Sequence, residues 1–240
     1  MRKIAADTHA HTIASGHAYS TIKEMAKAAR DKGLAGMALT EHAPKMPGTC
    51  HRFYFENLKV IPRNMDGVEL FFGAELNIMD GKGTLDLPDG LLKELDIVIA
   101  SIHGPCYGKS RSREENTKAY LNVMQNPYVD IIGHPDDGRF PVCYEDLVKG
   151  AKESGKLLEV NNSSLRPNGF RENARENIRE MLKYCEKYGA CVTFGSDAHV
   201  DVDAGNFCYI EQIIDELKFP EELIATTSVE KLKTYLHHFR

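Results

Sequence analysis

Two histidines separated by one residue stand close to the N-terminus, in the stretch DTHAHT at 7–12. On a β-strand, Asp7, His9 and His11 would point to the same face, because side chains alternate along a strand with a period of two. Imidazoles beside a carboxylate are ligands that divalent metal ions accept. The chain therefore begins with a candidate metal-binding strand end.

Seven of the ten histidines stand at the end of a short apolar run or in the loop directly after one. Two carboxylates, late in VELFFGAELNIM and ACVTFGSDAH, have this placement as well. The complete set is His9, His11, His17, His42, Glu75, His103, His134, Asp197 and His199. A single histidine is most often an ordinary core or surface residue, but so many polar groups gathered together need partners. Divalent metal is the partner that this set indicates. His51, His237 and His238 fall outside the pattern, and the last two are expected in solvent.

The elements that must position these residues are seven apolar runs, which alternate with amphipathic segments. The runs are KIAADTHAH, AGMALTEH, VELFFGAELNIM, DIVIASIH, VDIIGHP, KLLEVNNSS and ACVTFGSDAH. The segments STIKEMAKAARDKG and SREENTKAYLNVMQNP each open with capping-box spacing, Thr21 with Glu24 and Ser112 with Glu115. YEDLVKGAKESG and NARENIREMLKYCEKYG are expected to be helices that end at their final glycines. Two more helices, over 209–217 and 229–238, complete the chain.

Strands that alternate with helices, without a linker or a break in composition, predict one α/β domain over residues 1–240 with a parallel sheet. An open doubly wound sheet and a closed barrel both fit this alternation. The metal-ligand types, however, stand at the carboxyl end of every strand except the sixth, which ends in the polar run 161–164. In a (β/α) barrel those ends meet at one mouth. We therefore expect a TIM-barrel-like (β/α)7 barrel with its metal site at the C-terminal mouth of the strands.

Composition narrows the setting of the protein. The 240 residues are 42% hydrophobic and 27% charged, as in ordinary globular proteins. No apolar run approaches the roughly 20 residues of a membrane helix, and MRKIAAD meets charge too early for a signal peptide, so a cytoplasmic location is the default expectation. The formal charge of −5 disfavours a broad nucleic-acid surface. The six scattered cysteines are expected to be reduced and mostly buried.

Taken in order, the motifs resemble those of the PHP (polymerase and histidinol phosphatase) domain family along nearly the whole chain. They are D-x-H-x-H at 7–11, His17, T-E-H at 40–42, Glu75 in GAEL, S-I-H at 101–103, G-H-P at 133–135 and S-D-A-H at 196–199. The length and the N-N-S-S run look most like the YcdX-type metal-dependent phosphatases within this family. The resemblance implies a distorted (β/α)7 barrel with a trinuclear metal site, and no ligand position of the motif is missing.

The resemblance also implies how the ligands divide among three divalent ions. His9, His11, Glu75 and Asp197 would hold the first, Glu75 as a bridge with His103 and His134 the second, and His17, His42 and His199 the third. Zinc is the expected metal, with manganese or iron as alternatives, because histidine-rich sites accept all of them. With two acidic ligands, the mouth would carry a net charge of about +4, or about +3 with one bridging hydroxide.

A mouth this positive favours a phosphate anion over a neutral amide or sugar. Paired metals lower the pKa of bound water and clamp the oxygens of an in-line displacement, so we expect metal-activated hydroxide to hydrolyse small phosphomonoesters. Asp7, Glu75 and Asp197 are the candidate catalytic residues. Asp7 would handle a proton or orient the nucleophile, or would only fix a histidine tautomer. Arg166 and Arg139, in the loops after the sixth and fifth strands, are candidates for binding the phosphate, or else solvated loop residues.

Alternative functions stay open beside this one. Histidinol phosphate is one specific candidate substrate. A 3'-5' exonuclease-like phosphodiesterase is disfavoured by the absence of a polymerase segment or basic stripe, although a short nucleic-acid strand end could still reach the site. A non-catalytic metal-binding module is disfavoured by the intact ligand set. The expected partner is a small phosphorylated substrate, with no membrane, and the oligomeric state stays open.

Overall fold

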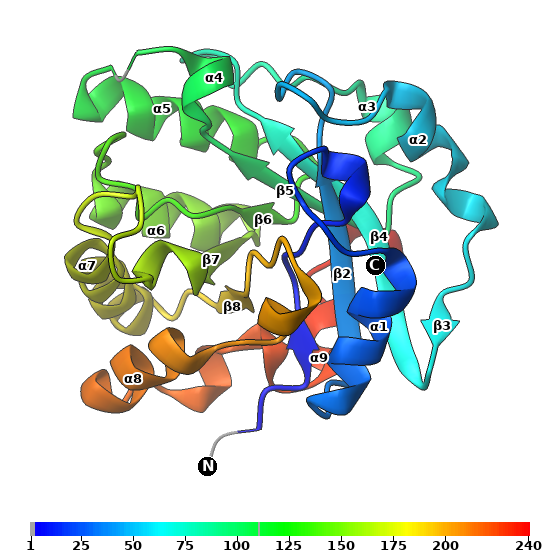
Figure 1. The fold of residues 1–240 in the computed structure, drawn as a ribbon. Coiled ribbons are helices and arrows are strands. Elements are labelled where there is room, and N and C mark those ends of the chain that lie inside the picture. Colours follow the sequence, from blue (N-terminus) through cyan, green and yellow to red (C-terminus); the bar gives the residue numbers. More distant parts are fainter. Residues whose placement is uncertain (1–2, 110) are drawn as a thin grey trace.

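Seven parallel strands form the central sheet of the protein, for which the computed structural model describes residues 3–109 and 111–240 (Figure 1). In the sheet they follow the order of the chain: β1 (Ala6–Asp7), β2 (Gly36–His42), β4 (Val68–Asn77), β5 (Ile97–Ser101), β6 (Ile131–Ile132), β7 (Leu157–Asn161) and β8 (Val192–Gly195). A short strand, β3 (Asn64–Met65), pairs antiparallel with the start of β4. The seven predicted strands are all present, and β3 is an addition that the alternating pattern did not indicate.

The sheet curls until its first and last strands meet, which gives a nearly closed barrel with one unsealed seam (Figure 1). Across the seam the Asp197 N–H donates to the His9 carbonyl (2.8 Å) and the His11 N–H to the Ala198 carbonyl (2.9 Å). The pairing there is an isolated bridge between Ala10 and Ala198 rather than a ladder. An open doubly wound sheet would leave β1 and β8 at opposite edges, so the predicted seven-stranded barrel is confirmed.

Helices surround the barrel (Figure 1). They are α1 (Ile22–Asp31), α2 (Arg52–Asn57), α3 (Asp89–Leu92), α4 (Gly104–Tyr107), α5 (Arg113–Met124), α6 (Tyr144–Ser154), α7 (Ala174–Tyr188), α8 (Cys208–Leu217) and α9 (Val229–Lys233). Both predicted capping boxes are formed, at the starts of α1 and α5. The backbone turns left-handed at Gly155 and Gly189, where α6 and α7 end as predicted.

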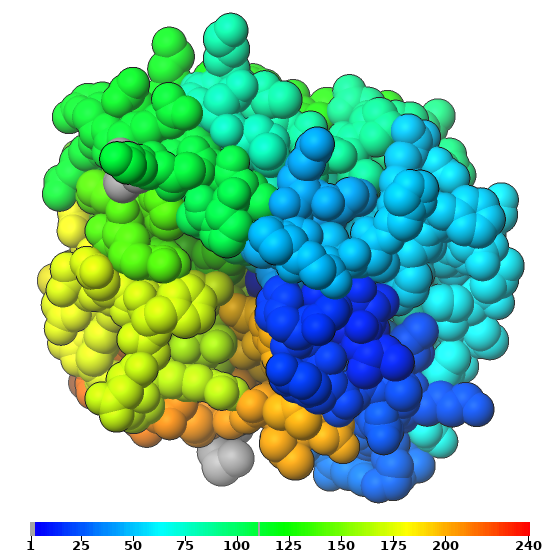
Figure 2. Space-filling view, turned by 45° about the horizontal axis from the view of Figure 1, so that its top comes forward, coloured from blue at the N-terminus to red at the C-terminus, as the bar shows by residue number. Residues whose placement is uncertain are grey.

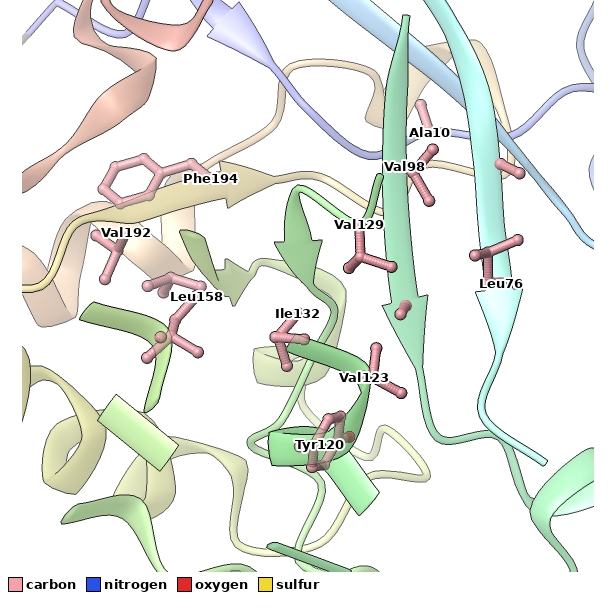
Figure 3. Close-up of a cluster of buried hydrophobic side chains, with 14 of the residues drawn as sticks. Ala10, Leu76, Val98, Tyr120, Val123, Val129, Ile132, Leu158, Val192 and Phe194 are labelled. Atoms are coloured by element: carbon pink, nitrogen blue, oxygen red, sulfur yellow. The ribbon is translucent and has the colours of Figure 1, made fainter. Parts of the chain in front are cut away.

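Apolar side chains form two separate cores, one inside the barrel and one outside it. The inner core joins strand residues such as Ala38, Phe71 and Leu157 to Val229 of α9. The outer core lies between the barrel and its helices. Figure 3 shows part of it, where Ile132 of β6 lies near Val123 and Tyr120 of α5. The barrel is therefore packed on both faces, as predicted from the nearly continuous apolar strands.

Inward-facing positions change from apolar to polar along β2 and β4. On β4 the residues of one face run from Phe71, in the inner core, through Gly73 to Glu75 and Asn77, all of them buried. On β2 they run from Ala38 to His42. Because the strands are parallel, their polar ends share one end of the barrel. The fold thus places a buried polar layer directly above an apolar floor.

The structure differs from the sequence expectations at both ends of the chain. β1 is regular only over Ala6–Asp7, so its alternation does not continue through the two histidines. The last helix ends at Lys233 rather than at 238. His237, expected in solvent, has a side chain only 9% exposed, and its ring nitrogens face Asp130 Oδ2 (3.0 Å) and the Leu92 carbonyl (3.1 Å). These contacts exist because the chain end packs beneath the barrel.

Two expectations from composition can be compared with the structure. All six cysteines are free, but Cys185 alone is fully buried and Cys208 is exposed, so the expectation of mostly buried thiols is wrong. Within the described residues, no helix is both long enough and apolar enough to span a bilayer.

Candidate metal centre

All nine candidate ligands converge at the carboxyl ends of the strands. The parallel register makes His42 of β2 and Glu75 of β4 direct neighbours. The ring of His11 lies with its centroid 4.2 Å from that of His42 and 4.5 Å from that of His199. His17, from the loop after β1, adds its ring at 4.8 Å from His42 and 5.0 Å from His199. Residues spread over most of the chain thus form one cluster.

Glu75 lies at the centre of this cluster and has imidazoles on both of its oxygens. Oε1 is 2.8 Å from His134 Nε2 and 3.1 Å from His103 Nε2. Oε2 is 2.7 Å from His42 Nδ1 and 3.4 Å from His9 Nε2. The carboxylate is 1% exposed. Its two oxygens therefore face different ligand groups, which is the arrangement of a bridging carboxylate.

Asp197 occupies the opposite side of the cluster, directly after β8. Its Oδ1 lies 3.4 Å from His11 Nε2 and 3.6 Å from His199 Nδ1. Its Oδ2 accepts hydrogen bonds from Arg171 Nη2 (3.0 Å) and Asn161 Nδ2 (3.2 Å). The backbone of Asp197 has a φ of 53°, in the left-handed region. This sharp turn after the strand directs Oδ1 into the cluster while Oδ2 is held from behind.

Three sets of candidate ligand atoms lie within 4.8 Å of one another: His11, His42 and His199; His9, His11 and Glu75; and His42, Glu75 and His103. The sets overlap, so they form a continuous cluster rather than separate sites. Among the buried atoms without a hydrogen-bond partner in the described structure are Glu75 Oε2, His42 Nδ1 and His134 Nδ1. Imidazole nitrogens and carboxylate oxygens left in this state fit divalent cations of the zinc, manganese and iron type.

Glu159, on β7, supports two of the ligands and was missed from the sequence. Its Oε1 lies 2.7 Å from His9 Nδ1, and its Oε2 accepts the backbone N–H of His134 at 2.7 Å. Burial opposes the charges of both groups, but their mutual attraction lowers the pKa of Glu159 and raises that of His9 well above its usual value. A signal existed: in KLLEVNNSS the period of two places Glu159 on the same face as Asn161.

Two more ligands are oriented by hydrogen bonds to their outer ring nitrogens. Ser15 donates to Glu41 Oε2 (2.6 Å), so the same hydroxyl accepts from His11 Nδ1 (3.3 Å). This fixes the proton of His11 on Nδ1 and leaves the Nε2 lone pair facing the cluster. His103 Nδ1 likewise lies 2.8 Å from Asn77 Oδ1. Such outer partners hold ligand rings in place and are typical of metal sites.

The pKa shifts of Glu75, Asp197 and His11 suit metal binding. Burial alone would raise the pKa of Glu75, but His103 and the other imidazoles hold it well below its ordinary range. The pKa of Asp197 is likewise lowered against burial, first by His9. Burial lowers the pKa of His11 well below its usual value. The two carboxylates are therefore ionised and His11 is neutral, as ligands must be.

The sequence of this chain matches a known protein family. Residues 7–219 match the PHP domain. The chain belongs to the PHP domain family. The family predicted from the order of the motifs is thus confirmed over nearly the whole chain.

Relatives of this PHP domain match it along almost their full length. A protein from Clostridium novyi (strain NT) is 50% identical and one from Thermoanaerobacter sp. (strain X514) is 49% identical, each over 98% of this chain and 95% of its own; both are named probable phosphatase. A solved structure of histidinol phosphate phosphatase from Lactococcus lactis subsp. lactis, in complex with zinc, L-histidinol and phosphate, matches with a TM-score of 0.64 over 90% of this chain and 95% of that one. At 18% identity, that likeness concerns the shared fold.

Asp7 of the PHP domain lies behind the ligands rather than among them. Its Oδ1 accepts the backbone N–H groups of Ser196 (3.0 Å) and His9 (3.2 Å), and its Oδ2 accepts that of Gly205 (2.8 Å). The carboxylate is fully buried. The expectation that Asp7 shares a strand face with the histidines fails because the regular strand ends at this residue.

A cavity of about 610 Å³ opens above the ligand cluster. It is visible in Figure 2 as a hollow where the blue, green, yellow and orange segments meet. The candidate ligands that line it are His17, His42, His103, His134, Asp197 and His199. The cavity gives the cluster direct access to a ligand from solvent.

Among the described residues, three arginines line this cavity, including both that were predicted. Arg139 pairs with Asp137 at 2.6 Å and Arg166 with Asp203 at 2.5 Å. Arg171, which the sequence did not single out, lies deepest, with a side chain 8% exposed. Its Nε has no hydrogen-bond partner in the described part of the chain. No local motif marks Arg171, because its partner Asp197 is distant in sequence.

We predict that Gly195→Ala disrupts the support of His9. A Cβ at this position would lie 2.0 Å from Glu159 Oε1 and 2.7 Å from His9 Cβ, so the buried pair would have to move. We expect a loss of about 1–3 kcal/mol in unfolding free energy, together with lower metal content. Chemical denaturation and elemental analysis measure the two effects. Gly90→Ala is the matched control, since a Cβ there meets open space; equal behaviour of the two variants would contradict the prediction.

Proposed function

We propose that this PHP domain hydrolyses phosphomonoesters of small molecules at a site that holds three divalent ions. One observation carries the proposal: seven imidazoles and two carboxylates, from both sides of the barrel seam, converge beneath a cavity that also contains a buried arginine. A cationic pocket of this kind suits a phosphate dianion better than a neutral substrate.

The phosphatase class is supported by the relatives. Proteins about half identical over 98% of the chain are named probable phosphatases, so the prediction of a phosphatase hydrolase is confirmed at this level. The substrate is a finer question. The Lactococcus lactis enzyme was solved with L-histidinol and phosphate, which makes histidinol phosphate one compound to test here.

The ligand groups that we propose follow the division implied by the family. They are His9, His11, Glu75 and Asp197; Glu75, His103 and His134; and His17, His42 and His199. When bound, divalent ions supply Lewis-acid charge and lower the pKa of water. Glu159 and Arg171 add one negative and one positive charge to the predicted sum, so the expected excess of positive charge at the mouth is unchanged.

The side chains of the protein supply position and charge. Arg171 holds Oδ2 of Asp197 and lines the cavity, where its guanidinium would donate to a phosphate oxygen. Arg139 and Arg166 lie farther out, where their aspartate partners partly neutralise them. We therefore propose Arg171 as a phosphate-binding residue beside the two that the sequence indicated.

We propose that Asp7 positions the ligands and does not transfer protons. Its oxygens already accept three backbone N–H groups in the segments that carry His9 and Asp197. We predict that Asp7→Asn, which replaces an acceptor with a donor, lowers stability by about 1–3 kcal/mol and reduces metal content together with turnover. Asp31→Asn, at an exposed site in α1, should change none of these. Normal metal content with lost turnover would instead assign Asp7 a role in the reaction.

The proposed function is tested with protein loaded separately with zinc, manganese or iron. p-Nitrophenyl phosphate serves as the monoester substrate, and bis(p-nitrophenyl) phosphate serves as the diester substrate. A 3'-labelled oligonucleotide tests cleavage at the end of a nucleic-acid strand. We expect turnover of the monoester to exceed that of both diesters. Preferred cleavage of the oligonucleotide would favour the exonuclease alternative, and failure of all substrates with every metal would leave a metal-binding module.

A further inference from the structure

The cavity is much larger than a phosphate group. A phosphate occupies about the volume of a few water molecules, each about 30 Å³ in the liquid, whereas the cavity measures about 610 Å³. If the phosphate lies against the ligand cluster, as the proposed function requires, most of the remaining space faces the leaving group. The lining of this outer part therefore selects the substrate.

Two exposed aromatic side chains stand in this outer part. Tyr19 is 76% exposed and Phe170 is 68% exposed, although large apolar side chains are normally buried. They come from different loops, one after β1 and the other after β7. The other apolar lining residues are Met46, Ile102, Pro105 and Val200. Exposed apolar groups that gather in one cavity are typical of a ligand surface.

Phe170 is held in place by charged neighbours. The guanidinium carbon of Arg139 lies 4.8 Å from its ring centroid and that of Arg171 lies 5.3 Å away. These contacts fix the ring through cation–π attraction. Because 68% of the residue is still accessible, most of the ring surface remains free for a further contact. The ring is thus oriented at the cavity without being covered.

The charges of the outer cavity disfavour a positively charged leaving group. Both outer carboxylates are occupied, Asp137 by Arg139 and Asp203 by Arg166. The carboxylate farther in, Asp197, is occupied by Arg171. Among the described lining residues, each acidic group is therefore already paired with an arginine. A substrate ammonium would meet guanidinium groups and no carboxylate free to accept it.

We infer that the preferred substrates carry a planar aromatic ring and no positive charge on the leaving group, and that Phe170 and Tyr19 determine this specificity. The inference rests on the proposed function, which places the phosphate at the ligand cluster. It predicts that a leaving group such as that of histidinol phosphate, which bears an ammonium, is a poor fit.

The experiment compares ethyl, 2-phenylethyl and 2-aminoethyl phosphate, whose alkyl leaving groups differ in ring and charge. The corresponding phosphonates, which cannot be hydrolysed, report binding to the metal-loaded protein by calorimetry. We expect the phenyl compounds to exceed the ethyl compounds about tenfold in kcat/KM and in affinity, as for stacking on one aromatic ring. The aminoethyl compounds should do no better than the ethyl ones.

Variants assign the preference to residues. Phe170→Ala and Tyr19→Ala should each reduce the phenyl-to-ethyl ratio toward one, while Phe170→Tyr keeps the preference. Phe53→Ala is the control, since Phe53 is 66% exposed but lines a separate surface hollow on α2. Equal values for phenyl and ethyl compounds, or a preference for the aminoethyl ones, would overturn the inference. Phosphonate selectivity without turnover would support it while refuting the phosphatase proposal.

Discussion

Glu75→Gln is expected to abolish turnover and to lower the metal content of the purified protein. Glu75 lies at the centre of the cluster. Its oxygens lie within 3.4 Å of four imidazoles, and its side chain is buried. The substitution keeps the shape but removes the negative charge that would be shared between ions. Loss of the charge stabilisation supplied by one or more ions corresponds to a decrease in kcat of about 10³-fold or more.

The control for this variant is Glu69→Gln on the same strand. The substitution is chemically the same, but Glu69 lies at a partly exposed site, where its Oε1 is 2.6 Å from Lys233 Nζ. We expect wild-type metal content and turnover for Glu69→Gln. Elemental analysis and hydrolysis of p-nitrophenyl phosphate measure both variants. A Glu75→Gln protein with full metal content and activity would remove the bridging role proposed for this residue.

Metal removal should have the second large effect, on both activity and stability. Exhaustive chelation is expected to reduce turnover to background, and readdition of the divalent ion should restore it. Ligands that bind the folded state alone stabilise it by about 2.7 kcal/mol at one hundred times their Kd. For a domain of this size we expect the melting temperature to fall by about 5–10 °C on chelation.

The Glu75→Gln variant also provides the control for chelation. If the loss of stability comes from the cluster, this variant should melt at nearly the same temperature with and without chelator, whereas Glu69→Gln should shift like the wild type. Scanning calorimetry of the three proteins measures the difference. A wild-type protein that keeps its activity after its metal has been shown to be absent would refute the metal-dependent reaction.

The sequence predicted those parts of the structure that depend on local patterns. The capping boxes of α1 and α5 lie within four residues, and each ligand stands at the end of an apolar run. The parallel topology then brings these ends together, because all strands of a (β/α) barrel run in the same direction and end at the same mouth. For this reason the nine candidate ligands could be named before their distances were known.

The parts that could not be predicted depend on contacts between distant residues. Glu159 is recognisable only once His9 is known to lie beside it, and Arg171 only once Asp197 is in place. The position of Asp7 behind the ligands depends on the interruption of β1 after it, which no residue in DTHAHT indicates. Pairing of Arg139 and Arg166 with aspartates is likewise a property of loop conformation.

The unsealed seam has a consequence for how the chain folds. Ala10 and Ala198 pair at the seam although most of the chain separates them in sequence. Closing so long a loop costs conformational entropy, and the short backbone pairing at the seam offsets little of this cost. His9 and His11 stand on one margin of this gap and Asp197 and His199 on the other. A cation bound between them would act as a cross-link that forms late in folding. Amide exchange at positions near 10 and 198 should therefore be fastest in the cation-free protein and slow when zinc is supplied, while exchange in β4 and β5 stays the same.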